Sequence, residues 1–108
     1  MSGFSIWPNE RRREERQFFI ATIELIETAV HERIRARTGD LSMHGCYVDT
    51  VNTFPVGSNV RLTIIYNEET FTADGVVAHA KEKLGMGISF SSVDHKQKEI
   101  LLKWLTSP

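Results

Sequence analysis

Short segments rich in β-branched residues, separated by turn residues, fill the second half of this chain and restrict its fold more than any other feature. The two clearest connections are residues 52–59, which include Pro55 and Gly57, and the polar hairpin residues 67–69. Strand signals that recur at this spacing are typical of an antiparallel barrel or a β-sandwich. The predicted strands are residues 46–51, 60–66, 70–80 and 84–90.

Residues 17–37 are ambiguous, because their apolar positions fit two periods. Helical spacing, which the periodicity slightly favours, fits Phe19, Ile23, Ile26, Val30 and Ile34. Strand alternation fits Ala21, Ile23 and Leu25, and the many β-branched and aromatic residues also favour strands. In that second interpretation, residues 28–32 connect a strand at about 17–27 to another at about 33–40. The residues alone leave both structures open.

The last segment, residues 93–105, has the pattern of an amphipathic helix. Ser92 or Asp94 is placed to cap its first turn. Such a helix is expected to cover an open end of the β structure with an apolar stripe of Ile100, Leu101, Trp104 and Leu105. Trp104 and Trp7 each face either the core or a neighbouring molecule, so the oligomeric state stays open.

The length of 108 residues suits one domain with one core. Residues 1–9 lack periodicity and are predicted to form a flexible arm, and residues 10–108 the domain. Cys46 is the only cysteine, which excludes an intrachain disulfide and favours a reducing compartment such as the cytoplasm. The N-terminus lacks the order of a signal peptide, and no apolar run approaches the ~18 residues of a membrane span. A cytoplasmic protein without membrane insertion is expected.

The charges argue for selective recognition of an anion. A formal net charge of −1 does not suit a general polyanion binder, because non-specific nucleic-acid binding neutralises many phosphates. All eight arginines nevertheless lie within the first 61 residues, and all five lysines follow position 80. The planar fork of donors on arginine binds phosphates and guanine edges through two bonds at a time. Anion recognition is therefore predicted for the N-terminal half.

No catalytic or metal-binding motif is present in the sequence. The four histidines are scattered, and no spacing of histidine and cysteine matches a metal site. Cys46 follows a glycine in a predicted strand, where a small core side chain is a better interpretation than a nucleophile. Phosphate-binding glycine loops and nucleophile elbows are also missing. We expect a protein that is not an enzyme and that needs no metal or other cofactor.

Two short motifs remain, and each is weak alone. Arg12 and Arg16 form an R-x-x-x-R pair, which an ordinary solvated charged flank also explains. A D-x-S-x-x-G motif begins at Asp40 and ends at Gly45, at the end of a predicted strand. By itself this second motif describes a capped turn, in which the aspartate and Ser42 bind local amides and the glycine supplies a positive φ.

The two motifs, in this order and with Arg16 and Asp40 24 residues apart, together resemble the signature of the PilZ family, the receptors for the bacterial second messenger cyclic di-GMP. The resemblance covers nearly the whole chain, including residues 57–60, residues 85–90 and the closing helix. It implies a six-stranded antiparallel β-barrel with a C-terminal α-helix, which makes residues 17–40 two strands. The implied parts are an R-x-x-x-R arm at 11–16, a barrel at about 17–90 and a helix at about 93–105.

The same resemblance implies that both motifs bind cyclic di-GMP. Arg12 and Arg16 would contact phosphates and the acceptor edge of guanine, and would stack on purine faces. Asp40 would accept hydrogen bonds from the donor edge that guanine has and adenine lacks, which predicts guanine specificity. Ser42 would offer a hydroxyl to phosphate or purine, and Gly45 would leave space for the ligand or the turn.

The resemblance also implies a mechanism that is allosteric and not catalytic. Arg11, just before the pair, is similar to family members that bind two mutually intercalated cyclic di-GMP molecules, so one or two ligands per chain are expected. Arg13 and His44 are expected on the solvated surface. The ligand would order the arm from about Ser5 to Arg16 and create a surface for an unidentified downstream protein.

Two alternatives to a cyclic di-GMP receptor stay open. The first is a PilZ-like fold that acts as a ligand-independent protein-interaction module. The second is nucleic-acid binding by the arginine-rich arm, but residues 10–16 carry four arginines against three glutamates, an excess of one. So small an excess does not suit strongly salt-dependent binding, and no nucleic-acid partner is expected. The pathway stays open between motility, the exopolysaccharide secretion of biofilms, and transcription.

Overall fold

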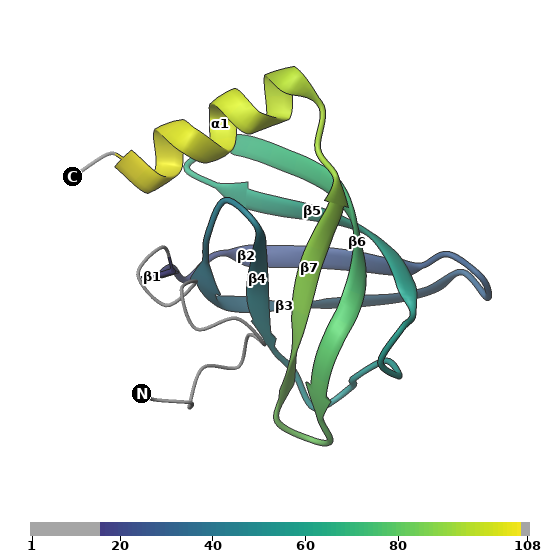
Figure 1. Cartoon of the computed structure of the whole chain (residues 1–108). Helices are drawn as coiled ribbons and strands as arrows, with labels where there is room; N and C mark the ends of the chain where they lie inside the picture. Colours follow the sequence, from purple (N-terminus) through teal and green to yellow (C-terminus); the bar gives the residue numbers. More distant parts are fainter. Residues whose placement is uncertain (1–15, 107–108) are drawn as a thin grey trace, which may run out of the picture.

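Strands dominate the structure, and a single helix follows them (Figure 1). The computed structural model describes residues 16–106, and all counts of elements refer to that part of the chain. Its elements are β1 (Gln17–Phe18), β2 (Thr22–Glu27), β3 (Glu32–Leu41), β4 (Gly45–Asp49), β5 (Asn59–Tyr66), β6 (Glu69–Lys81), β7 (Gly85–Ser92) and α1 (His95–Thr106).

The strands form one antiparallel sheet that closes on itself. Neighbours follow the order β1, β3, β2, β5, β6, β7, β4, and a further pairing of β3 with β4 completes the ring. The six longer strands are the predicted six-stranded barrel, which is confirmed together with its C-terminal helix. The two-residue β1 lies in line with β2, since Phe19 N donates to Gly39 O and Thr38 N donates to Ala21 O along the same edge of β3.

The helical interpretation of residues 17–37 is wrong, because these residues form β1, β2 and the first part of β3. The side chains that point into the barrel alternate along the chain and are buried: Phe19, Ala21, Ile23 and Leu25. Val30, an apolar position of the helical pattern, is 70% exposed in the turn between β2 and β3. A barrel interior selects every second residue of a strand, and pairing of β2 with both β3 and β5 outweighs the local helical spacing.

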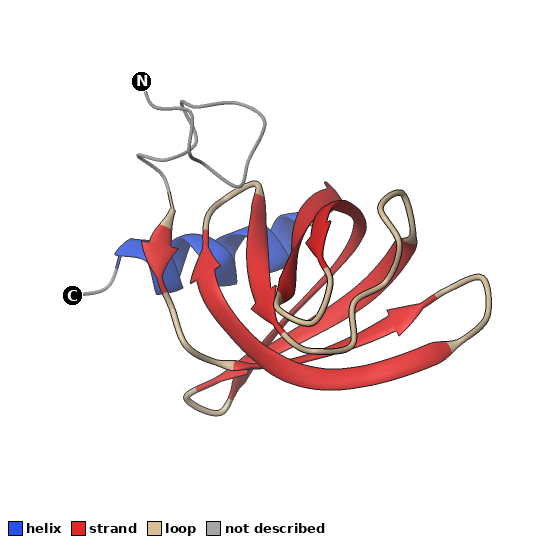
Figure 2. Ribbon diagram, turned by 90° about the horizontal axis from the view of Figure 1, so that it is seen from below, coloured by secondary structure: helices blue, strands red, loops and turns tan. Residues whose placement is uncertain are grey.

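Helix α1 lies across one end of the barrel, as Figure 1 and the turned view of Figure 2 both show. Asp94 caps the helix rather than Ser92, because Asp94 Oδ1 accepts a hydrogen bond from Gln97 N at 3.1 Å. Leu101 and Trp104 are buried on the face of α1 that meets the strands. The predicted apolar stripe therefore covers the core.

Trp104 joins α1 to the barrel through a cluster of aromatic rings. Its ring centroid lies 5.6 Å from those of Phe19 and Tyr66 and 6.2 Å from that of Phe71. Its Nε1 donates a hydrogen bond to Glu69 Oε1 at 3.1 Å, so the one polar atom of the buried ring is satisfied. Trp104 therefore faces the core.

The single cysteine belongs to the core. Cys46 is completely buried, and burial raises the pKa of its thiol, which confirms the interpretation of a core side chain. Within residues 16–106, no helix has both the length and the apolar character needed to cross a membrane.

Replacing Leu101 by alanine is expected to lower the free energy of unfolding by about 2–5 kcal/mol, because it removes fully buried methyl groups and leaves a cavity under α1. The neighbouring Leu102 is 51% exposed, and Leu102→Ala is the matched control, with an expected change within about 0.5 kcal/mol. Urea unfolding followed by tryptophan fluorescence measures both. Equal losses would contradict the assignment of the buried helix face.

Candidate functional site

Arg16 and Asp40, one from each sequence motif, form an ion pair beside the end of β3. Arg16 Nη1 lies 3.3 Å from Asp40 Oδ2, and the two side chains are 16% and 25% exposed. The strand register explains the contact, because Phe18 pairs with Asp40 and Gln17 pairs with Leu41. Arg16, the residue before β1, is therefore positioned beside the end of β3, within reach of Asp40. The structure thus brings the two motifs together across 24 positions of sequence.

The carboxyl group of Asp40 is held in a partly desolvated environment. Burial is the largest influence and raises the pKa of Asp40 above its ordinary value, although the Arg16 guanidinium and the backbone amide of Tyr47 oppose the shift. Its Oδ1 atom is buried and has no hydrogen-bond partner of normal geometry among residues 16–106. A molecule that donates hydrogen bonds here would complement a carboxylate that the protein leaves incompletely satisfied.

Ser42 is buried and holds the turn between β3 and β4. Its backbone N donates to the Gly45 carbonyl at 2.9 Å, its Oγ donates to the same carbonyl at 3.4 Å, and Oγ accepts from His44 N at 3.0 Å. These bonds form the serine part of the capped turn that the motif describes by itself. The positive φ expected at Gly45 is wrong: this residue opens β4 opposite Ser89, and among the described glycines a positive φ belongs to Gly57.

The remaining predicted residues fall into two groups. Arg11, Arg12 and Arg13 lie outside the described residues, as do Trp7 and the rest of the predicted arm. His44 is described, and with Met43 it lines a cleft of about 590 Å³ between the β3–β4 turn, the end of β7 and the start of α1. The structure therefore places one arginine of R-x-x-x-R against the D-x-S-x-x-G motif.

Tyr47 is a residue of this region that sequence reasoning missed. It pairs with Asp40 across β3 and β4, and a Cβ atom added at Gly85 would lie 2.5 Å from its hydroxyl oxygen. The absence of a side chain at this glycine therefore lets the half-buried ring lie against β7. Burial, followed by Asp49 and Asp40, raises the pKa of Tyr47. Because side chains two residues apart in a strand lie on the same face of the sheet, the position of Tyr47 two residues after Gly45 in β4 is the sequence signal that would have identified it.

A protein-family model described as "PilZ domain" matches residues 10–107. The chain belongs to the PilZ domain family. PilZ domains typically bind cyclic di-GMP and are receptor or adaptor modules, generally without enzymatic activity. In residues 16–106, no three histidine, cysteine, aspartate or glutamate side chains are grouped so that they could hold a metal ion.

Solved structures of other proteins, two of them PilZ domains, have the same fold. The Bacillus subtilis inhibitor of motility (MotI/DgrA) is 22% identical with a TM-score of 0.73, and the match covers 84% of this chain and 47% of that one. The PilZ domain of CeSA from a cellulose-synthesizing bacterium is 17% identical, with a TM-score of 0.66 and coverage of 83% and 93%. The PilZ domain of Escherichia coli YcgR, solved with cyclic di-GMP, is 14% identical, with a TM-score of 0.63 and coverage of 79% of each chain.

Because these structures are only 14–22% identical to this chain, the comparisons by themselves support its fold and not its ligand or partners. The present PilZ chain corresponds to about half the length of MotI/DgrA. A search of curated protein sequences gives no significant match. The functional argument therefore depends on the residues of this chain.

The raised pKa of Asp40 can be measured by following the side-chain carboxyl carbon by NMR as the pH is changed. We expect a pKa above the ordinary value of about 3.9, and a further rise in Arg16→Gln, because the guanidinium lowers the pKa. Arg35→Gln, which changes an exposed arginine paired with Glu24, is the control and should leave the pKa of Asp40 unchanged. A lower pKa in Arg16→Gln would contradict this electrostatic description.

Proposed function

We propose that this PilZ domain is a cytoplasmic receptor for cyclic di-GMP, which binds where the R-x-x-x-R and D-x-S-x-x-G motifs meet. The observation that carries the proposal is the ion pair of Arg16 and Asp40, which links the last residue of one motif to the first residue of the other. The E. coli YcgR structure, which contains cyclic di-GMP on the same fold, supports the choice of ligand. Family membership supports it independently.

Asp40 selects guanine over adenine. Guanine presents the donors N1–H and N2–H₂ on its Watson–Crick edge, and an ionised carboxylate is an acceptor only. Burial disfavours the charged form of Asp40 in the free protein, and hydrogen bonds donated by guanine would favour it. Binding of cyclic di-GMP is therefore expected to lower the pKa of this carboxyl group.

Arg12 and Arg16 supply the positive charge for the phosphates. When the ligand binds, the ion pair between Arg16 and Asp40 is replaced by contacts of each side chain with the ligand. The Arg16 guanidinium then contacts a phosphate or the acceptor edge of guanine, and the Asp40 carboxylate contacts the donor edge. Ser42 acts by holding the backbone of the turn, because both functions of its hydroxyl are used there. Gly45 keeps the first residue of β4 free of a side chain.

The signal is carried by the N-terminal arm. Cyclic di-GMP orders the arm from about Ser5 to Arg16 on the barrel, and the arm with its ligand forms a surface for a downstream protein. Ordering costs roughly 1–2 kcal/mol per residue, which multidentate contacts to the ligand offset. Arg11 provides a further guanidinium that stacks on a second, intercalated cyclic di-GMP, so that two ligands bind per chain.

Calorimetric titration of the full chain with cyclic di-GMP tests the receptor function. Arg12→Ala and Arg16→Ala are expected to abolish measurable binding because each removes a phosphate-binding fork, and Arg61→Ala, at an exposed arginine paired with Asp74, should bind like the parent protein. An affinity for cyclic di-GMP equal to that of the parent protein, in either Arg12→Ala or Arg16→Ala, would contradict the proposal. If the parent protein itself does not bind cyclic di-GMP, the result favours the ligand-independent interaction module instead.

The same titration resolves specificity and stoichiometry. Cyclic di-AMP should bind roughly 5- to 150-fold more weakly, because adenine lacks the N1–H and N2–H₂ donors of guanine, and an incompletely satisfied Asp40 carboxylate costs about 1–3 kcal/mol. A fitted value of two ligands per chain is expected. A value of one would contradict the role of Arg11 and leave the receptor function intact.

Hydrogen exchange measured by mass spectrometry tests the arm as the switch. Peptides from residues 5–16 are expected to exchange slowly only when cyclic di-GMP is present, whereas peptides from β5 and β6 should be protected in both states. Equal protection of the arm with and without ligand would mean that ordering of the arm is not the signal.

A further inference from the structure

One edge of β3 is open over half of the strand. Residues 32–36 pair with β2 on one side, but β4 joins the other side only from Arg37 onward. No other strand, turn or loop within residues 16–106 hydrogen-bonds to this stretch. Figure 1 shows the β2–β3 hairpin continuing past the region where β4 joins it. A sheet edge of roughly 16 Å, at ~3.3 Å per residue, is therefore unpaired in an otherwise closed barrel.

The backbone groups that point to the open edge belong to Arg33 and Arg35. Thr38 N donates to Ala21 O, on the β2 side, at 2.9 Å. Residues of an antiparallel strand direct their N–H and C=O groups alternately to the two sides, so the odd-numbered residues of this part of β3 face away from β2. The edge therefore offers two N–H donors and two C=O acceptors, in the arrangement that an added strand requires.

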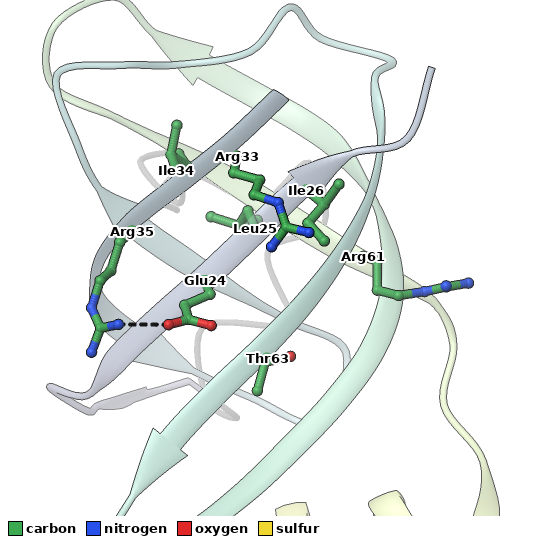
Figure 3. A pocket seen from close by; sticks show the side chains of 8 residues that line it. All are labelled: Glu24, Leu25, Ile26, Arg33, Ile34, Arg35, Arg61 and Thr63. Atoms are coloured by element: carbon green, nitrogen blue, oxygen red, sulfur yellow. Dashed lines mark hydrogen bonds and ion pairs between the residues drawn. The ribbon is translucent and has the colours of Figure 1, made fainter. Parts of the chain in front are cut away.

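Exposed arginines line the outer face beside this edge. Arg33, Arg35 and Arg37 alternate along β3 and are all exposed. Figure 3 shows Arg35 turned toward Glu24 on β2, with Nη1 and Oε2 2.6 Å apart. Arg33 and Arg37 form no ion pair with any residue of the described part of the chain. Asp49, exposed on β4 opposite Arg37, and Glu24 are the facing carboxylates, so three arginines against two acids leave the outer face with an excess of one positive charge at this edge.

Apart from Glu32, which is exposed at the hairpin end, the residues of the same stretch that alternate with the arginines are apolar. Ile34 and Ala36 are half-buried and pack against the core from the open side. A segment added at this edge would place one row of side chains beside the arginines and the other row beside these two apolar residues. The two rows call for different side chains, acidic outside and apolar inside.

A second copy of this chain does not suit the edge. Antiparallel self-pairing about Ile34 sets Arg33 directly opposite Arg35 of the other copy, and a register centred on either arginine sets that residue opposite itself. Like charges directly opposite each other destabilise a strand pair. A nucleic-acid backbone also fits poorly, because its phosphates have no donors for the two free carbonyl groups.

We propose that the open edge of β3 binds an extended segment of a partner protein in which acidic residues alternate with apolar ones. The segment adds a strand that bonds to the backbone of Arg33 and Arg35, and its acidic side chains lie beside the exposed arginines. This docking edge is separate from the candidate cyclic di-GMP site. Asp40 lies at the opposite end of β3, beyond the point where β4 joins.

Solution NMR of the ¹⁵N-labelled full chain tests the docking edge, with the blocked peptide TEVEVET as the probe. The amide signals of Arg33 and Arg35 are expected to shift, and their hydrogen exchange to slow, as the peptide is added. The double variant Arg33→Glu, Arg35→Glu should weaken binding by at least about tenfold, because attraction becomes repulsion at two positions. Arg61→Glu, which reverses an arginine on β5 away from the edge, is the matched control and should change the affinity by less than about twofold.

Two further peptides separate strand addition from simple charge attraction. A TEVEVET peptide with N-methyl groups on alternate amides keeps the charges but loses donors, and its failure to bind supports an added strand. Equal binding by TKVKVKT, or no amide shifts at millimolar TEVEVET, would overturn the proposal. So would binding of a dT oligonucleotide to these amides in place of the peptide, or a concentration-dependent dimer that the double variant abolishes.

Discussion

The pairing of β3 with β4 is the constraint on which the rest of the structure depends. β3 pairs with β2 and then β1 along one edge, and β4 joins the opposite edge from Arg37 onward, which closes the sheet into a barrel. A bulge between Thr38 and Asp40 lies where β4 joins. A Cβ atom at Gly39 would lie 3.3 Å from an oxygen of Asp49, so the smallest residue stands at the bulge and leaves the neighbouring carboxylate room. Closure gives nearly every strand two partners and encloses one continuous core.

The bulge also determines the character of the candidate site. It directs Asp40 to the outer surface just before the turn held by Ser42, and the short β1 delivers Arg16 to the same carboxylate. Burial raises the pKa of Asp40 because it disfavours the charged carboxylate, and the Arg16 guanidinium offsets only part of this rise. A ligand with both phosphates and guanine donors matches this pair better than a purely anionic one, so the proposed binding of a dianion is compatible with a net charge of −1.

Several features were predictable because they depend on local sequence. Turn residues separated the strands of the second half within a few positions of their observed bounds, and the apolar stripe of α1 identified its buried face. The first half was harder, because its apolar positions satisfy two periods and long-range pairing with β5 decided between them. The hydroxyl of Ser42 could be assigned to ligand or turn from its motif, and its bonds within the turn required coordinates. Tyr47 was missed because its importance comes from its neighbours across the sheet.

The amino-acid sequence by itself determined the family, the β-rich architecture and the two motifs, since these are carried by residue types at fixed spacings. Tertiary structure alone decided that Arg16 meets Asp40, that the aspartate is partly desolvated, and that half of β3 has an open edge beside its arginines. The physical reason is the same in each case. Strand register sets which distant residues become neighbours, and hydrogen bonding, burial and charge interaction depend on distances in space and not on separation along the chain.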